Sequence, residues 1–263
     1  MTAGKLLTVA ALLSLLTVSI VGQSADGIVI TQRMTTGGEP LTVRVHIDAT
    51  RMRTEMASAG GVMNVTIFDG GKHVLYIVDP ARKTYVEMTK ADVDRLRAQV
   101  QGAVAQMQSQ LEKLPPAQRA QMDAMLKGVE HTRTGSDGVG RWTCDKYDLT
   151  MNGQKIGEVC NVSLTTLGFV AADFDVMRRM GEFYSGMAPQ VPGQFPGPGG
   201  IDPGGNSGFP VRTVVIGPGG TVTTEVIEAD RQTFSDALFA VPAGFTKQDV
   251  TGAMGGRGTG AAR

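Results

Sequence analysis

Hydrophobic and polar residues alternate in short runs between Leu41 and Thr89, and turn residues separate these runs. From Leu41 to Ile47 every second residue is apolar, which directs one side of the segment to a core and the other to water. Residues 69–71 (Asp-Gly-Gly) stand between two such runs and are typical of a hairpin turn. The pattern predicts an antiparallel meander with strands at residues 27–33, 41–47, 51–57, 62–68, 74–78 and 84–88.

The period of the pattern changes after Thr89, a residue suited to cap the start of a helix. Apolar residues then recur at every third or fourth position until Pro115, and a second, shorter helical pattern follows and stops at Gly128. We therefore expect a helical insertion over residues 89–128 that lies across the sheet. Its apolar side chains include Val93, Leu96, Val100, Val104, Met107, Leu111, Leu114, Met122 and Met125.

The rest of the chain returns to strand patterns, with one more helix and one segment of low complexity. Strands are predicted at residues 129–134, 141–151, 154–162, 210–216 and 221–229, and an amphipathic helix at residues 164–187. Residues 188–209 are rich in Pro and Gly and cannot bury enough apolar surface to order themselves, so we expect a flexible loop there. Residues 251–263 are expected to be a disordered tail.

These elements predict one domain of the α+β class over residues 26–250. A sheet of this many strands twists and curls. We therefore expect a strongly curved antiparallel sheet, unclosed and half-barrel-like, with the amphipathic helices packed on its concave face.

The N-terminal residues predict export. Lys5 precedes an uncharged apolar run of about 16 residues and then a small polar stretch, the order of regions found in a signal peptide, here residues 1–25. A membrane anchor is the alternative, although a spanning helix needs about 20 residues. No cysteine precedes Cys144, which excludes a lipid anchor on an N-terminal cysteine. We expect a periplasmic or secreted protein with no transmembrane span in its mature form.

The two cysteines predict one disulfide, Cys144 to Cys160, because paired cysteines are usual in exported proteins. Two predicted strands meet at residues 151–153 (Met-Asn-Gly). A three-residue loop there would place Cys144 directly opposite Cys160, whereas a two-residue Asn-Gly turn would offset the pair. We expect the longer loop and a bond that staples the hairpin without a redox role.

The charge balance argues against a nucleic-acid partner, and the motifs argue against catalytic activity. Lys and Arg together number 25 and so do Asp and Glu, so no basic excess is available for a phosphate backbone. His46, His73 and His131 lie in separate predicted strands or at their edges, without metal-ligand spacing, and no nucleophile or phosphate-loop motif is present. We expect no catalytic residue, no metal and no cofactor.

Methionine offers one alternative to this expectation. The chain has 14 Met, and thioether sulfur suits Cu(I). Met122 and Met125, and likewise Met177 and Met180, have a spacing that places two sulfurs on one face of a helix. Packing in a core is the stronger interpretation, because Met fills irregular apolar contacts.

The order of several segments resembles a known family. The strand pairs TIFDGGKHVLYIVDPARKTYVEM, then LPPAQRAQM, the cysteine hairpin and a late LFAVPAGF resemble exported bacterial proteins catalogued as a domain of unknown function, number 4412. That family is similar to periplasmic lipoprotein carriers of the Lol type. The resemblance implies an unclosed curved barrel with helices in its mouth and an apolar cavity for acyl chains. It implies no catalytic residues.

The expected function is binding of an apolar or lipidic ligand, such as an acyl chain, in the cavity of the curved sheet. The alternative is a structural or interaction protein of the cell envelope, with a protein partner and no small-molecule ligand. Candidate cavity residues lie on the predicted helices: Val100, Val104, Met107, Leu111, Met122 and Met125.

Overall fold

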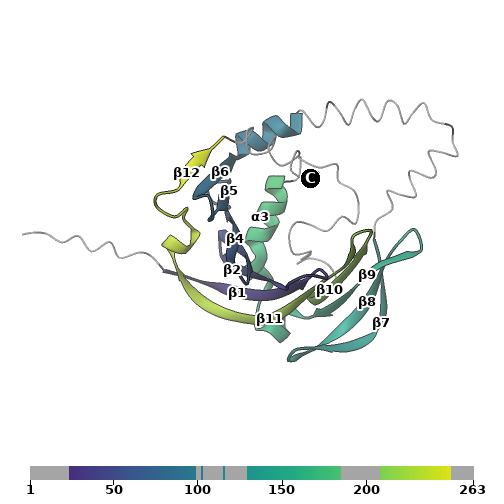
Figure 1. Ribbon diagram of the computed structural model, residues 1–263. Coiled ribbons are helices and arrows are strands. Elements are labelled where there is room, and N and C mark those ends of the chain that lie inside the picture. Colours follow the sequence, from purple (N-terminus) through teal and green to yellow (C-terminus); the bar gives the residue numbers. More distant parts are fainter. Residues whose placement is uncertain (1–23, 99–101, 103–114, 116–128, 185–207, 250–263) are drawn as a thin grey trace, which may run out of the picture.

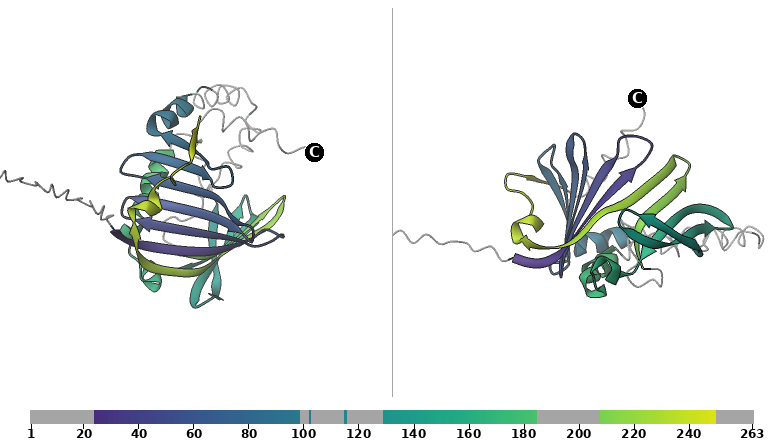
Figure 2. Two further views of the ribbon diagram at one scale, coloured as in Figure 1. Left: turned by 60° about the vertical axis from the view of Figure 1, so that its left-hand side comes forward. Right: turned by 90° about the horizontal axis from the view of Figure 1, so that it is seen from below.

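The computed structural model describes residues 24–98, 102, 115, 129–184 and 208–249. The described chain is mostly strand, and its strands form one mostly antiparallel sheet of twelve, in the order β12-β6-β5-β4-β3-β2-β1-β11-β10-β9-β8-β7. The sheet is strongly curved and does not close on itself (Figures 1 and 2). The expected curved, unclosed sheet is therefore confirmed.

The first half of the sheet is a meander, as the alternating pattern predicts. Each strand pairs with its neighbour in sequence, and the strands differ from their predicted ranges mainly at their ends. They are β1 (Ser24–Thr35), β2 (Leu41–Asp48), β3 (Arg51–Ser58), β4 (Gly61–Asp69), β5 (Val74–Asp79) and β6 (Thr84–Thr89).

The second half of the chain contributes five antiparallel strands and one parallel one. They are β7 (Glu130–Val139), β8 (Trp142–Met151), β9 (Gln154–Val162), β10 (Phe209–Gly217), β11 (Gly220–Ser235) and β12 (Thr246–Gln248). β11 pairs with β1 over its length and so joins the two halves. The short β12 returns to the first half and pairs in parallel with β6, a pairing that the sequence pattern does not predict.

Helical structure is limited among the described residues. Residues 90–98 are helical, and Thr89 caps this helix as predicted, because the Asp92 backbone N–H donates to Thr89 Oγ1 and the Thr89 N–H donates to an Asp92 carboxylate oxygen. No helix in this part of the chain is long and apolar enough to cross a membrane. The predicted signal peptide, the rest of the helical insertion, the Pro/Gly-rich loop and the tail lie outside the described residues, apart from a few positions at their margins.

The predicted single helix at residues 164–187 is wrong. The structure has two short 3₁₀ turns, η1 (Leu164–Leu167) and η2 (Ala171–Phe174), followed by α3 (Asp175–Tyr184). Gly168 ends η1 with φ of 77°, a left-handed conformation that stops helical hydrogen bonding. The apolar spacing survives this break because the turns and α3 bury their side chains in one core.

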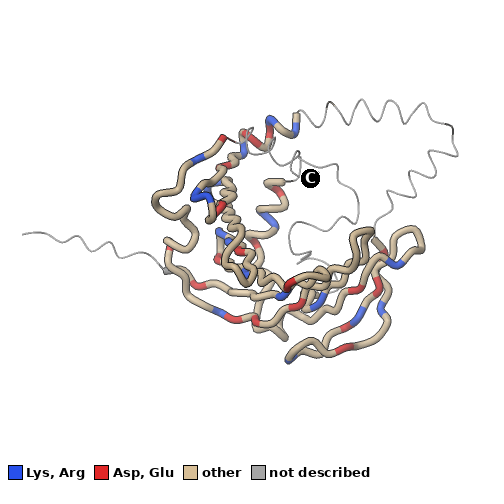
Figure 3. The backbone as a smooth tube through the Cα atoms, in the orientation of Figure 1, with Lys and Arg blue, Asp and Glu red and all other residues tan. Residues whose placement is uncertain are grey.

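Two apolar cores lie on the two faces of the sheet. The larger contains the buried side chains of α3 together with Ile28, Ile47 and Phe68. The smaller core lies on the opposite face. It contains Ile67, Phe234 at the end of β11 and Phe239 of η3 (Asp236–Phe239). Figure 3 shows acidic and basic residues interspersed along the strands.

The disulfide between Cys144 and Cys160 is confirmed, but the predicted register of its hairpin is wrong. The turn is the two-residue Asn152-Gly153, with φ of 54° and 74°, and a register shift follows between Leu149 and Thr150. Cys160 therefore pairs with Lys146, and Cys144 is its diagonal neighbour on the same face of the sheet. The twist of the strands brings the two Cα atoms to 5.4 Å.

Candidate functional site

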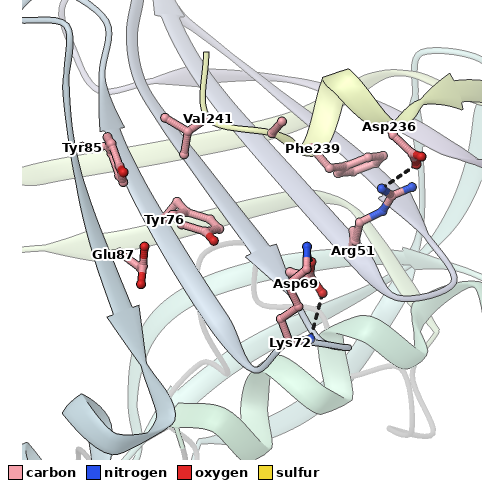
Figure 4. Close-up of a pocket in the computed structure, with 10 residues that line it drawn as sticks. Arg51, Asp69, Lys72, Tyr76, Tyr85, Glu87, Asp236, Phe239 and Val241 are labelled. Atoms are coloured by element: carbon pink, nitrogen blue, oxygen red, sulfur yellow. Dashed lines mark hydrogen bonds and ion pairs between the residues drawn. The ribbon is translucent and has the colours of Figure 1, made fainter. Parts of the chain in front are cut away.

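A pocket of about 460 Å³ opens on the face of the sheet that carries the smaller core. Strands β3, β4, β5 and β6 form its floor, and residues 236–241 cross above them (Figure 4). The pocket depends on this crossing, because its walls come from segments about 150 residues or more apart in the sequence. We refer to residues 236–248 as the C-terminal strap.

Arg51 ties the strap to the sheet. Asp48 Oδ1 accepts the Arg51 backbone N–H, which places Arg51 at the start of β3, and Arg51 Nη1 lies 2.7 Å from Asp236 Oδ1. The guanidinium also lies 4.5 Å from the centre of the Phe239 ring. Burial lowers the pKa of Arg51, but hydrogen bonds from the guanidinium to the two carboxylates outweigh it and raise the pKa.

The loop between β4 and β5 contributes a second ion pair. Asp69 Oδ1 accepts the backbone N–H groups of Gly71 and Lys72, as in an Asx turn, so the predicted turn is confirmed. Asp69 Oδ2 lies 2.8 Å from Lys72 Nζ. Burial raises the pKa of Asp69, but the bonds and charge of Lys72 outweigh it, and the pKa is lowered. Asp69 therefore stays ionised at neutral pH.

Aromatic rings and a third carboxylate line the β5–β6 side of the pocket. Tyr76 pairs with Glu87 across the two strands, and the Tyr76 and Tyr85 ring centres are 6.1 Å apart. Glu87 Oε1 lies 3.1 Å from Lys247 of the strap. Burial, and then the charge of Glu87, raises the pKa of Tyr76, so its hydroxyl remains protonated and can both donate and accept.

The side chains predicted to line a cavity are not tested by this geometry. Val100, Val104, Met107, Leu111, Met122 and Met125 all lie outside the described residues. Only the helix that precedes them is placed: Val93 is buried in the larger core and Leu96 packs against it.

The methionines of α3 are placed. Met177 and Met180 are 8% and 5% exposed and pack in the larger core, as the packing interpretation predicts. Their burial favours a structural role over a copper site.

Sequence reasoning missed the pocket. Alternation does place Tyr76, Tyr85 and Glu87 on the face opposite Leu75 and Met88. Nothing local shows that a segment from the end of the chain covers that face. The three histidines predicted to be separate are separate, and no group of three or more His, Cys, Asp or Glu side chains that could hold a metal ion occurs in the ranges that the structure describes.

Comparison with known proteins identifies a family but does not indicate an activity. A family model described as a domain of unknown function (DUF4412) matches residues 100–245, more than half of the chain. No significant match occurs among curated proteins.

Three solved structures are distant likenesses of the fold. An uncharacterized conserved protein from Thermus thermophilus has a TM-score of 0.45 and 12% identity, over 87% of this chain and 91% of that one. PNGF-II has a TM-score of 0.37 and 11% identity, over 88% of this chain and 32% of that one. The Pseudomonas aeruginosa MucA/MucB complex has a TM-score of 0.37 and 11% identity, over 83% and 56%. This chain thus spans less than two thirds of the latter two.

Proposed function

This chain belongs to the family described as a domain of unknown function (DUF4412), and we propose that it is an exported, non-enzymatic protein that binds an apolar or lipidic molecule against one face of its curved sheet. We assign the ligand to the face that carries the larger core. The position of α3 within the bend of the sheet in Figure 1 supports taking this face as the concave one.

A row of large apolar side chains crosses six strands on this face. Each member pairs with the next across the ladder, and all are 0–3% exposed: Ile28, Ile47, Met52, Phe68, Leu75 and Met88. Residues of α3 pack in the same core, and the Phe68 and Phe183 ring centres are 5.4 Å apart. This row is filled by the protein itself.

The proposed ligand surface is the next row of side chains on the same face. It runs through Ile30, Val45, Thr54, Thr66, Ile77 and Val86 in register, and only Ile30 among them is fully buried. Val45 and Ile77 pack against the larger core while keeping part of their surface exposed. An acyl chain laid along this second row would gain about 0.8 kcal/mol for each methylene that it removes from water.

The residues predicted to line a cavity fit the same proposal. Val93 and Leu96 begin an apolar stripe whose sequence continues through Val100, Val104, Met107 and Leu111. We propose that these residues, with Met122 and Met125, cover a ligand on the second row, since flexible Met side chains adapt to varied apolar shapes.

Lipid capture and one matched pair of variants test the proposal. The full chain, purified from a host that exports it, is expected to carry an acyl compound in native mass spectrometry and to bind 11-dansylaminoundecanoic acid saturably. Ile77→Ser, on the second row, should weaken binding of this probe at least fivefold. Ile216→Ser, at a 47% exposed position on β10, should leave it unchanged. An empty protein without saturable binding, or equal binding by both variants, refutes the proposal.

One observation supports the alternative of an envelope interaction protein. β7 pairs with β8 on one side, and within the described part of the chain no strand pairs with its other edge. Backbone groups of such an edge can bind an extended segment of a partner. Crosslinking in the native envelope that depends on residues 130–139 and persists without bound lipid favours this function over the first.

A further inference from the structure

We propose that the pocket beneath the C-terminal strap binds a neutral carbohydrate. This site lies on the opposite face of the sheet from the proposed lipid surface, and none of its lining residues belongs to that surface. The inference therefore stands or fails separately from the proposed function.

Aromatic rings from three elements border the pocket. Tyr76 and Tyr85 stand on β5 and β6, and Phe239 comes from the strap (Figure 4). Both tyrosines are half-buried and so keep part of their surface open, whereas Phe239 is 6% exposed and anchors the strap. A sugar ring presents its C–H groups on one face, and these pack favourably on the negative face of an aromatic ring.

Each carboxylate that lines the pocket has a cationic partner, and Arg51 pairs with Asp48 as well as with Asp236. Asp69 meets Lys72 at 2.8 Å, and Asp236 meets Arg51 at 2.7 Å. Glu87 meets Lys247 at 3.1 Å. An anionic ligand would have to displace Asp69 or Glu87 from its lysine. It would leave that carboxylate, whose side chain is only 11% or 26% exposed, without its partner, which is costly. The pairing therefore favours a ligand without negative charge.

The paired groups still have hydrogen-bonding capacity for hydroxyl groups. An ionised carboxylate can accept about four hydrogen bonds, so a single cation partner leaves lone pairs available. Glu87 and Tyr76 lie opposite each other across β5 and β6, which sets an acceptor beside a phenol that both donates and accepts. Neighbouring hydroxyls of a sugar need this combination, and a pocket of about 460 Å³ has the size of a small-molecule site.

Saturation-transfer NMR on the full chain with its disulfide intact tests the inference. The probes are four neutral disaccharides (maltose, cellobiose, lactose and diacetylchitobiose) and two charged sugars, glucose 6-phosphate and galacturonate. At least one neutral disaccharide should bind saturably, and the charged sugars should bind at least tenfold more weakly. Tyr76→Ala and Glu87→Gln should each weaken the neutral sugar at least tenfold.

Two further variants separate binding from folding. Tyr76→Phe keeps the ring and should lose only part of the affinity, and Tyr147→Ala, on β8 outside the pocket, should bind like the parent. Circular dichroism checks that each variant is folded. The inference is overturned if no neutral disaccharide saturates, if a charged sugar binds as tightly, or if folded Tyr76→Ala and Tyr76→Phe both bind as the parent does.

Discussion

His46 is a buried side chain whose polar atoms are incompletely satisfied. It is 8% exposed, its Nδ1 has no hydrogen-bond partner, and its ring meets the edge of Phe234 at 5.4 Å between centres. Burial is the main cause of its lowered pKa. The charge of Glu55 raises the pKa, while those of Arg53 and Arg44 lower it. The imidazole therefore stays neutral in the folded protein at pH values where an exposed histidine binds a proton.

This position makes stability depend on pH in a defined direction. The unfolded chain takes up a proton on this histidine near pH 6.5, and the folded chain does so only at lower pH. The contribution of His46 to the free energy of unfolding is therefore present above pH 6.5 and is lost as the pH falls toward the folded pKa. Urea unfolding at pH 7.5 and 5.0 should show a smaller acid loss for His46→Leu than for the parent.

The exposed His131 provides the control. His131→Gln should retain the acid loss of the parent. An acid loss in His46→Leu equal to that of the parent would show that other groups cause it.

Two glycines of the regular elements differ in how much room their surroundings leave for a side chain. A Cβ on Gly157 of β9 would lie 2.2 Å from the Val214 carbonyl oxygen of β10, well inside contact distance. A Cβ on Gly181 of α3 would meet nothing within 4 Å. Glycine is thus required by strand pairing at the first position and by nothing in the described structure at the second.

The same substitution should act in opposite directions at these two sites. Gly157→Ala should lower the free energy of unfolding by about 2–3 kcal/mol, because β9 and β10 must separate to admit the methyl group. Gly181→Ala should raise it by about 0.5–1 kcal/mol, since alanine loses less backbone entropy in a helix. Urea unfolding of both variants measures the two changes. A tolerated Gly157→Ala would contradict the close approach of the two strands.

Pairing between β1 and β11 joins the two parts of the sheet. β1 and β11 share a register from Ser24 opposite Ser235 to Thr35 opposite Thr223, and they connect the first meander to the cysteine hairpin side of the sheet. The larger core crosses this joint, since it contains both Ile28 and Trp142. The two halves therefore bury apolar side chains in one shared core.

We therefore expect unfolding in one cooperative transition. Trp142 is the sole tryptophan and reports on the second half of the sheet, whereas far-UV circular dichroism reports on all strands. The two signals should give the same urea midpoint, because the shared core couples the halves. Midpoints that differ beyond error would show that the halves unfold independently.

Local patterns in the chain were enough to predict the strands of the meander, the cap at Thr89 and the partners of the disulfide. Alternation with period two sets which side of a strand is buried, and a cap needs only residues within one turn. Where a local signal was ambiguous, as in the cysteine hairpin turn, the expected register was wrong. The break at Gly168 was missed because apolar spacing alone does not reveal a left-handed residue.

The meeting of distant segments became visible only in the assembled fold. There β1 pairs with β11, β12 returns to β6, and Asp236 reaches Arg51 across 185 residues to close the pocket. Such contacts follow from the burial of complete faces, which offsets the entropy of closing long loops. A single sequence carries no local pattern for that balance, so the pocket beneath the strap could not be predicted before the sheet was assembled.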